Sequence, residues 1–345
     1  MTGFFNVYKE AGYTSHDVVA IIKKLTKTKA GHTGTLDPQA EGVLPICIGS
    51  ATKLASMITG QDKSYTAEVV LGFETDTGDT TGQILKQSVV KYDKDAICAA
   101  VESFRGPQLQ IPPMYSAIKI DGKRLYKLAR EGQTVERKPR AVEIMDINVL
   151  EHRPTSNTFI IDVSCSKGTY IRSLCSDIGK ALGICATMGA LLRTRSGAFS
   201  LDTAIKLAKL KEAAENGSLN KLLLAPEKVL PFSCAYVQPE GLLLAKNGNP
   251  IPLNMVNFEN NPTVGKFWLY GPNESDDVIA EDSTSRAGEV IAEDCTRKAG
   301  DMIGLFAIDN IFNPENVVID DTSGSKKRVI STIAAPQKLR PEVML

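Results

Sequence analysis

The sequence predicts an α+β fold, in which a mixed sheet is flanked by helices and a smaller β-rich domain follows. Apolar and polar residues alternate along residues 63–72 and 158–164, as they do in half-buried strands. Apolar residues recur at helical spacing along residues 15–27 and 174–182. Two prolines then interrupt the helical pattern within residues 226–231, and short strand-like pieces with turn residues follow.

Length and composition are those of a globular protein with two domains. The chain has 345 residues, more than a single hydrophobic core usually supports, and 43% of its residues are apolar and 23% charged. We expect a larger domain at residues 1–228, a smaller one at 229–312 and a flexible tail at 313–345.

No stretch of the sequence has the pattern of a targeting or membrane segment. Residues 1–13 lack a charged start followed by an apolar block, and no apolar run approaches the ~20 residues of a membrane helix. The seven cysteines form no CxxC pair and have no histidine at a metal-ligand spacing. Buried, reduced thiols are the simplest interpretation, and we expect a cytoplasmic protein.

Helices and strands are mixed along the first 72 residues. Gly12 provides a turn, and Ser15 after it is a suitable N-cap for a helix. The expected elements are a strand at 6–9, a helix at 15–27, a loop at 31–42, an apolar strand at 43–49, a short helix at 51–59 and a strand at 63–72.

The same mixture continues through the rest of the larger domain. Asp121-Gly122 is a dipeptide typical of hairpin turns, and Gly183 is suited to end a helix. The expected elements are a helix at 93–104, an extended segment at 110–116, a strand at 117–120, a basic helix at 125–131, paired strands at 140–150 and 158–164, a helix at 174–182, a strand at 189–197 and a helix at 203–214.

A tandem repeat lies in the smaller domain. Residues 278–289 and 290–301 agree at eight of twelve positions. Two copies are too few for a solenoid, so we expect a local duplication that lengthens a strand–turn–strand element.

The most unusual stretch is the glycine-rich segment at residues 31–42, which runs into an apolar strand. Its three glycines and Pro38 exclude a regular helix, so it is a loop with unusual backbone angles or a close approach to a ligand. Asp37 precedes Pro38, which favours an extended backbone. A carboxylate on such a loop is suited to chemistry, and the alternative is an aspartate that only makes a turn.

Charge is balanced over the whole chain but not locally. The formal net charge is zero, which argues against a nucleic-acid binder that relies on bulk charge. Residues 119–140 carry eight basic and three acidic side chains, a net of +5, whereas residues 273–301 carry three and nine, a net of −6. A local basic patch is suited to binding phosphates, and the alternative is a solvated face.

Several common kinds of catalytic site are missing from the sequence. There are only three histidines, and no G-x-S-x-G elbow, phosphate-binding loop or dinucleotide fingerprint occurs. An arginine can both keep an aspartate ionised and aim it, and Arg172 after the turn at Gly168 is suited to do so for Asp37. The remaining polar candidates are His32, Tyr65, Asp79 and Tyr170.

Taken singly, each candidate has an ordinary structural explanation. Tyr65 and Tyr170 would be core or strand aromatics, and Arg172 would form a surface ion pair. His32 would be a loop histidine with satisfied hydrogen bonds, and Asp79 would cap a turn.

Four motifs that occur together favour a role in a functional site over these structural explanations. In this order they resemble the TruB family of tRNA pseudouridine synthases, and the resemblance covers about residues 6–210. The motifs are GHTGTLDP at 31–38 with GVLP at 42–45, KSY at 63–65, IPPMYSA at 111–117 and GTYIR at 168–172.

The resemblance implies a fold and a domain plan. The fold would be that of pseudouridine synthases, a mixed and mainly antiparallel sheet with flanking helices. Residues 1–228 would form the catalytic domain. Residues 229–312 resemble the family's PUA-like RNA-binding domain only weakly.

The resemblance also implies an activity, the isomerisation of uridine 55 in the T-loop of tRNA to pseudouridine. The uridine would be flipped out of the loop, and Asp37 would be the nucleophile on its ribose or its base. Tyr65 would stack on the uracil, and Arg172 would pair with Asp37. The positions matching nucleotide contacts of the family are His32, Tyr65, Tyr170 and Leu191.

The expected partner is tRNA, bound by a monomer without cofactor, nucleotide or metal. Asp79 falls where the family often has an acidic partner for the arginine. The acidic repeat at 278–301 would repel phosphate, so either it points away from the tRNA or its domain does not bind RNA. Phosphate contacts are expected from Lys119, Lys123, Arg124, Lys127 and Arg130.

Two other functions are compatible with parts of the sequence. One is a catalytically inactive protein that binds tRNA or assists its folding, which the intact Asp37, Tyr65 and Arg172 argue against. The other is a carboxylate-dependent hydrolase of small nucleosides, which lacks an obvious second carboxylate and leaves the basic run at 119–140 unexplained.

Overall fold

The computed structural model describes residues 1–120, 122–258, 265–272, 302–308 and 338–344. The chain forms two compact units, Met1–Val229 and Leu230–Leu345. The strand–turn–strand element predicted for the tandem repeat at 278–301 lies outside the described residues.

The first unit is built on a ten-stranded sheet with the order β14-β1-β3-β12-β4-β11-β10-β7, to which β2 adds at β3 and β13 at β12. All neighbours are antiparallel except β1–β14 and β3–β12. The predicted mixed, mainly antiparallel sheet is therefore confirmed. Its strands are β1 (Gly3–Lys9), β2 (Ala30–His32), β3 (Glu41–Ile48), β4 (Lys63–Leu71), β7 (Gly106–Gln110), β10 (Arg140–Arg153), β11 (Thr158–Cys165), β12 (Ala186–Ser196), β13 (Phe199–Ser200) and β14 (Ile205–Lys206).

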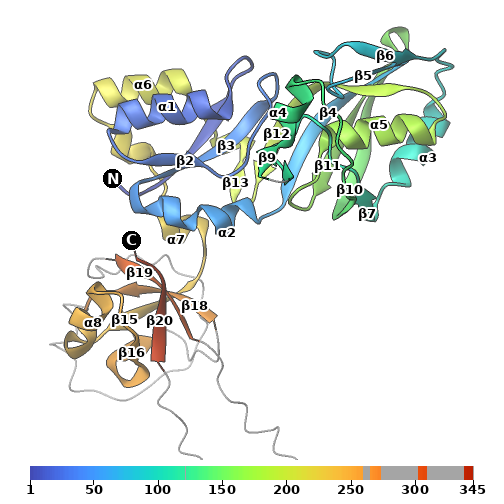
Figure 1. The fold of residues 1–345 in the computed structure, drawn as a ribbon. Helices are drawn as coiled ribbons and strands as arrows, with labels where there is room; N and C mark the ends of the chain where they lie inside the picture. The colour runs from blue at the N-terminus through green and yellow to red at the C-terminus, as the bar shows by residue number, and fades with distance from the viewer. Residues whose placement is uncertain (121, 259–264, 273–301, 309–337, 345) are drawn as a thin grey trace, which may run out of the picture. The chain divides into compact units, whose positions relative to one another are not determined.

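Helices flank this sheet, as predicted. Figure 1 shows α1 (Ser15–Thr26) and α6 (Leu207–Glu215) packed together, and α5 (Ile171–Ala181) running along the sheet near α3 (Lys94–Glu102). Further short elements are α2 (Ala55–Thr59), α4 (Leu125–Arg130), α7 (Pro226–Val229) and the hairpins β5 (Phe73–Thr75) with β6 (Ile84–Gln87) and β8 (Lys119–Ile120) with β9 (Lys123–Arg124).

Strand β4 places one candidate side chain. Its inward positions Tyr65, Ala67 and Val69 are buried, whereas Thr66 and Glu68 between them are partly exposed, so the predicted alternation is confirmed. Because the inward face belongs to the core of the unit, the direction of the Tyr65 side chain is set by the burial of its neighbours.

The start of α1 differs from the prediction. Thr14 is the N-cap, because its hydroxyl accepts from the Asp17 backbone N–H at 3.1 Å and its own N–H donates to the Asp17 carboxylate at 2.8 Å. Ser15 is the first helical residue and is buried, and its hydroxyl bonds Leu36 instead. Thr14 therefore caps the helix in place of Ser15, and the Ser15 hydroxyl bonds the loop that carries Asp37.

The second unit has its own sheet, with the order β16-β20-β19-β18-β15-β17. Trp268 is wholly buried, and its indole N–H donates to the Leu230 carbonyl at 2.8 Å. The elements are β15 (Ser233–Val237), α8 (Leu242–Lys246), β16 (Ile251–Pro252), β17 (Val256–Phe258), β18 (Gly265–Tyr270), β19 (Met302–Ile308) and β20 (Lys338–Met344).

Strand β20 corrects part of the predicted flexible tail at 313–345. Residues 338–344 pair with β16 and β19. The prolines of this region argued for a mobile segment, but Pro341 lies where the β19–β20 register is irregular, a position at which a strand tolerates proline. Residues 313–337 lie outside the described part of the chain.

Candidate active site

The loop that carries Asp37 joins β2 to β3 and is fastened to α1. The buried Ser15 hydroxyl accepts from the Leu36 N–H at 2.9 Å and donates to the Leu36 carbonyl at 3.1 Å. One side chain therefore satisfies both backbone groups of the residue before Asp37, which limits the directions in which the Asp37 carboxylate can point.

Lys9, at the end of β1, fastens the other side of the loop. Its side chain is fully enclosed, and Nζ donates to the carbonyls of Glu10 at 3.2 Å, Pro38 at 3.0 Å and Ala40 at 2.6 Å. Burial lowers the pKa of Lys9 to about 8, so the group is still a cation at neutral pH. Its three N–H donors then match the three carbonyls.

Arg193, on β12, links the loop to the sheet. Its Nε donates to the Val43 carbonyl at 2.7 Å and its Nη2 to the Gly34 carbonyl at 3.1 Å, and the side chain is 1% exposed. Gly42 lies directly against its backbone: a Cβ there would be 2.3 Å from the Arg193 carbonyl oxygen, and φ is +105°. Only glycine fits that position, which explains one of the glycines of the loop.

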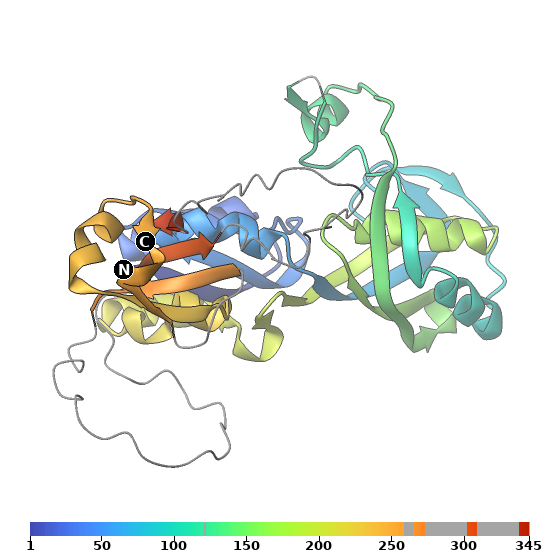
Figure 2. The same ribbon diagram turned by 90° about the horizontal axis from the view of Figure 1, so that it is seen from below.

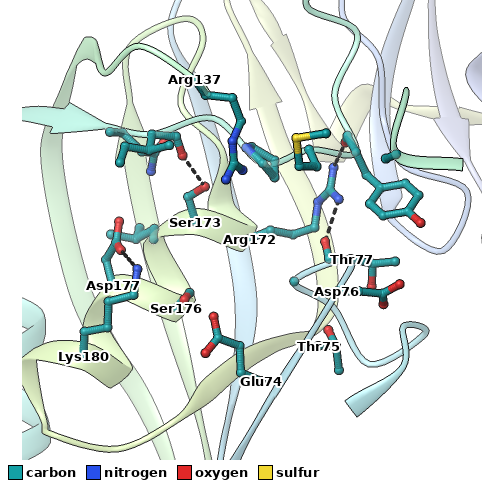
Figure 3. A pocket seen from close by; sticks show the side chains of 18 of the residues that line it. Glu74, Thr75, Asp76, Thr77, Arg137, Arg172, Ser173, Ser176, Asp177 and Lys180 are labelled. Carbon is teal, nitrogen blue, oxygen red and sulfur yellow. Dashed lines mark hydrogen bonds and ion pairs between the residues drawn. The ribbon is translucent and has the colours of Figure 1, made fainter. Parts of the chain in front are cut away.

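Asp37 and Arg172 form a two-point ion pair. The Arg172 Nε lies 3.0 Å from Oδ2 of Asp37, and its Nη2 lies 3.4 Å from Oδ1. The remaining donors of Arg172 bond the carbonyls of Thr77 at 2.8 Å and Tyr115 at 2.7 Å, the first of which is drawn in Figure 3. Arg172 is 7% exposed and Asp37 is 37% exposed, so the arginine is held in place while the carboxylate reaches solvent.

The environment of Asp37 shifts its pKa upwards. Burial is the main cause and the Asp79 charge adds to it, whereas Arg172 and Lys9 oppose the rise. The cations therefore keep a desolvated carboxylate usable as an anion, and a desolvated anion is a stronger nucleophile than a hydrated one.

Tyr65 lies on the β4 neighbour of Arg193, with which it is paired in register. Burial raises the pKa of the Tyr65 hydroxyl, and a hydrogen bond with Arg193 opposes the rise. Tyr65 is 7% exposed and stays protonated at neutral pH. Its ring is thus locked in the sheet, and Arg193 connects it to the loop of Asp37.

The three other predicted nucleotide contacts come from three different elements. His32 ends β2, half-buried, with its ring 5.4 Å from that of His16 and its pKa lowered first by burial and then by His16 and Arg193. Leu191 on β12 pairs with Ala67 and so shares a face with Tyr65. Tyr170 precedes α5, and the Gln110 amide bonds its backbone N–H and carbonyl at 2.8 and 3.0 Å.

The structure does not bring Asp79 onto Arg172. One Asp79 carboxylate oxygen accepts from the hydroxyls of Thr77 and Thr81 at 2.8 and 2.6 Å and from the Thr81 N–H at 3.0 Å. The carbonyl of Thr77, rather than the Asp79 carboxylate, meets the guanidinium. Asp79 therefore shapes the turn that contacts Arg172, which is the ordinary explanation given above.

The predicted phosphate-binding residues lie together on one projecting segment. Lys119, Lys123, Arg124, Lys127 and Arg130 are all exposed, on β8, β9 and α4. Figure 2 shows this segment standing out from the sheet. The Arg124 and Arg130 guanidinium carbons lie 5.9 and 5.6 Å from the centre of the Tyr126 ring, which orients both cations.

A cleft of about 760 Å³ lies on the other side of Arg172 (Figure 3). Its wall includes Arg172 and Tyr115, and among its described lining residues there is neither Asp37 nor Tyr65. Arg137 and Ser173 also line it, and they donate to the carbonyls of Pro112 and Ile111, both at 3.0 Å. The arginine that holds Asp37 is therefore reached from this cleft as well.

No group of three or more His, Cys, Asp or Glu side chains is placed to hold a metal ion in the described part of the chain. Nor does any described helix have the length and apolarity to cross a membrane.

Comparison with known proteins identifies the family. A model described as the TruB family pseudouridylate synthase (N-terminal domain) matches residues 23–171, and one described as the tRNA pseudouridylate synthase B C-terminal domain matches residues 172–231. A protein of Alkaliphilus oremlandii named tRNA pseudouridine synthase B is 54% identical over 256 residues, covering 74% of this chain and 84% of that protein. This chain belongs to the TruB family.

Other TruB relatives agree with this assignment. The tRNA pseudouridine synthase B of Bacillus subtilis is 44% identical over 236 residues, covering 67% of this chain and 76% of that protein. Among solved structures, a chain of a Cbf5–Nop10–Gar1 complex superposes with a TM-score of 0.59 at 28% identity, covering 78% of this chain and 74% of that one. The predicted membership of the family is confirmed.

Sequence reasoning missed three residues of this TruB site: Lys9, Ser15 and Arg193. Each is a buried polar residue: Lys9 on β1, Ser15 on α1 and Arg193 on β12. A weak signal was present for Lys9 and Arg193, since each ends or continues a buried strand where a cation needs partners. Those partners are backbone carbonyls of the loop, which sequence spacing does not reveal.

Proposed function

We propose that this protein isomerises uridine 55 in the T-loop of tRNA to pseudouridine, with Asp37 as the nucleophile on a flipped-out uridine. The observation that carries the proposal is the two-point ion pair between a partly exposed Asp37 and a buried Arg172. Membership of the TruB family supports the reaction, and relatives named tRNA pseudouridine synthase B support tRNA as the substrate.

The reaction moves a bond without a net change in atoms. The Asp37 carboxylate adds to the ribose C1′ or to the uracil C6, and the N1–C1′ glycosidic bond breaks. The uracil rotates, its C5 bonds to C1′, the proton on C5 passes to solvent, N1 takes up a proton from solvent, and Asp37 is released. Both routes need an ionised and fixed carboxylate, which Arg172 and the fastened loop provide.

The other side chains bind the flipped nucleotide. Tyr65 presents an immobile ring on which the uracil stacks, at low entropic cost because the ring is already locked. His32, Tyr170 and Leu191 surround the nucleotide, and the exposed cations of residues 119–130 contact phosphates of the T-stem and loop. With tRNA as its substrate, we propose that the protein acts in the cytoplasm and as a monomer.

The test is tritium release from tRNA labelled at C5 of uridine. Wild-type protein releases tritium from unmodified tRNA, and a tRNA with cytidine at position 55 blocks release. Asp37→Asn has nearly the same shape and abolishes release while keeping tRNA affinity within about threefold, because the amide is not a nucleophile. Undiminished turnover by Asp37→Asn contradicts the mechanism. Tight tRNA binding without release by the wild type supports the alternative, an inactive folding-assistance protein.

A further inference from the structure

A second group of titratable side chains lies where α3 packs against the sheet, apart from the residues described so far. Cys98 belongs to α3, His152 lies near the end of β10, and Tyr92 comes just before α3. Figure 1 shows α3 beside the β7–β10 edge of the sheet. None of the three contacts the loop of Asp37 through a described hydrogen bond or ion pair.

Hydrogen bonds within this group determine the tautomer of His152. The Tyr92 hydroxyl donates its single proton to the Thr158 carbonyl at 2.9 Å. Its oxygen lies 3.1 Å from Nδ1 of His152, so Nδ1 carries a proton and donates to it. The lone pair of the neutral imidazole is then on Nε2, and that atom lies 3.6 Å from the Cys98 sulfur.

The result is a thiol whose base is oriented by a third group. The Cys98 S–H donates to His152 Nε2, and Tyr92 and Thr158 fix the imidazole from its far side. This is the order of parts that activates cysteine nucleophiles: thiol, base and a residue that holds the base. Tyr92 stays a neutral hydroxyl because burial raises its pKa.

Cys98 is also reachable from solvent. It is exposed, whereas the other five cysteines in the described part of the chain are buried. Charged groups on both elements form ion pairs with other residues: Glu102 pairs with Arg105, and Arg153 pairs with Glu151 and Glu68. Cys98 lines neither of the two described pockets.

We propose that Cys98 is a site of thiol–disulfide exchange with low-molecular-weight disulfides. His152 Nε2 takes the thiol proton, and the Cys98 sulfur attacks one sulfur of the disulfide R–S–S–R. A Cys98–S–S–R bond forms and the original S–S bond breaks. The departing R–S⁻ takes the proton from His152 and leaves as R–SH. Cys98 is oxidised to a mixed disulfide, half of the reagent is reduced to a thiol, and a reducing thiol reverses the step.

The experiment measures reaction with 2-hydroxyethyl disulfide at neutral pH. The reduced full-length protein is quenched with acid at intervals, and peptide mass spectrometry follows each cysteine separately. We expect the Cys98 peptide to gain the adduct while the peptides of Cys47, Cys165, Cys175, Cys185 and Cys234 do not. His152→Gln slows the modification of Cys98 by about tenfold, because the glutamine side chain cannot take the thiol proton.

Matched measurements separate a specific role of His152 from loss of the fold. Tyr92→Phe also slows the reaction of Cys98, since it removes the acceptor of the Nδ1 proton, and both variants keep tritium release from tRNA near the wild-type rate. Equal rates at Cys98 in the wild type and both variants overturn the proposal, as does a wild-type Cys98 that stays unmodified.

Discussion

Asp37 shows how one residue acquires a role from its partners. Alone on its loop it would be a turn residue, but its carboxylate meets two nitrogens of Arg172, at 3.0 and 3.4 Å. Burial raises the pKa of Asp37 and Arg172 opposes that rise. The arginine thus both positions the carboxylate that we propose as the nucleophile and widens the pH range in which it is an anion.

Arg172 variants therefore change the pH profile as well as the rate. Turnover of the wild type falls as pH decreases through the raised pKa of Asp37, because the protonated form is not nucleophilic. Removing the cation in Arg172→Ala raises that pKa further, so the acidic limb of the kcat profile moves to higher pH and turnover near neutrality falls by more than tenfold. tRNA affinity changes by less than about threefold.

Arg172→Lys is the matched control for this prediction. It keeps the positive charge and loses the two-point contact, so its acidic limb stays nearer to that of the wild type while kcat is still reduced. A loss of tRNA affinity in Arg172→Ala with an unchanged profile would instead assign Arg172 to phosphate binding.

Lys9 is predicted to matter for stability. Lys9→Met keeps the length of the side chain but leaves the carbonyls of Glu10, Pro38 and Ala40 without their donor. Unfolding in urea should show a loss of about 1–3 kcal/mol. Lys24→Met, an exposed position on α1, should leave the transition midpoint almost unchanged. Equal midpoints for both variants would contradict the proposed role of Lys9 in fastening the loop.

At the scale of elements, the site depends on the close approach of β3 to β12. This pair is one of two parallel contacts in a mainly antiparallel sheet, and it pairs Gly42 with Arg193. Gly42 is in close contact with the Arg193 backbone, and the Arg193 side chain returns to the carbonyls of the loop. The backbone geometry at Gly42 and the position of the loop therefore both depend on the same contact with Arg193.

Gly42→Ala is therefore predicted to be strongly destabilising. An alanine Cβ would lie 2.3 Å from the Arg193 carbonyl oxygen, at a φ of +105° that alanine rarely adopts. We expect thermal unfolding at a temperature at least several degrees lower, together with reduced tritium release. Gly31→Ala, where a Cβ would meet no atom within 4 Å, is the control and should unfold near the wild-type temperature. Similar melting of the two variants would show that the strand contact relaxes easily.

Elements with one repeating pattern were predictable from the sequence, and contacts across elements were not. The alternation in β4 predicted the burial of Tyr65, and the spacing of apolar residues predicted α3 and α5 within a few residues. The register between strands could not be predicted from the sequence, so Leu191 could not be placed beside Ala67. Strand β20 was missed because a proline usually argues against a strand.

Within the candidate site, too, some features could be predicted from the sequence and others could not. The pairing of Asp37 with Arg172 was predictable from the family motifs, because motif order identifies positions even where spacing is long. Ser15 was assigned to the wrong role, as a helix cap, because Thr14 competes for the same position and only the folded chain shows which residue prevails. Asp79 was expected beside Arg172, but its own turn offers three closer donors.

At the scale of the whole molecule, a chain with no net charge carries a local group of cations, through which we propose that it binds RNA. The five exposed cations on β8, β9 and α4 stand on a projecting segment, and two of them lie against the Tyr126 ring. If RNA binding depends on a few such contacts, its affinity should fall with rising salt concentration, and the slope of that fall should reflect the number of phosphates contacted.

The variant Lys123→Ala tests the number of phosphates that these cations contact. If Lys123 neutralises one phosphate, the variant binds tRNA more weakly, and the slope of log affinity against log salt concentration becomes shallower by about one unit or slightly less. Filter binding or fluorescence titration between low and moderate salt measures the slope. Lys209→Ala, an exposed position on α6 outside the basic run, should keep the wild-type slope. An unchanged slope in Lys123→Ala would remove that residue from the phosphate contacts.

The fastening of the Asp37 loop by distant residues also bears on how the protein is made. Asp37 leaves the ribosome early, but the arginines that hold it and its loop are at positions 172 and 193. At about 5–20 residues per second, the loop waits roughly 10–30 s for strand β12 to be synthesised. A nascent chain therefore exposes the proposed nucleophile before its site is arranged, and the proposed reaction becomes possible only after β12 has been translated.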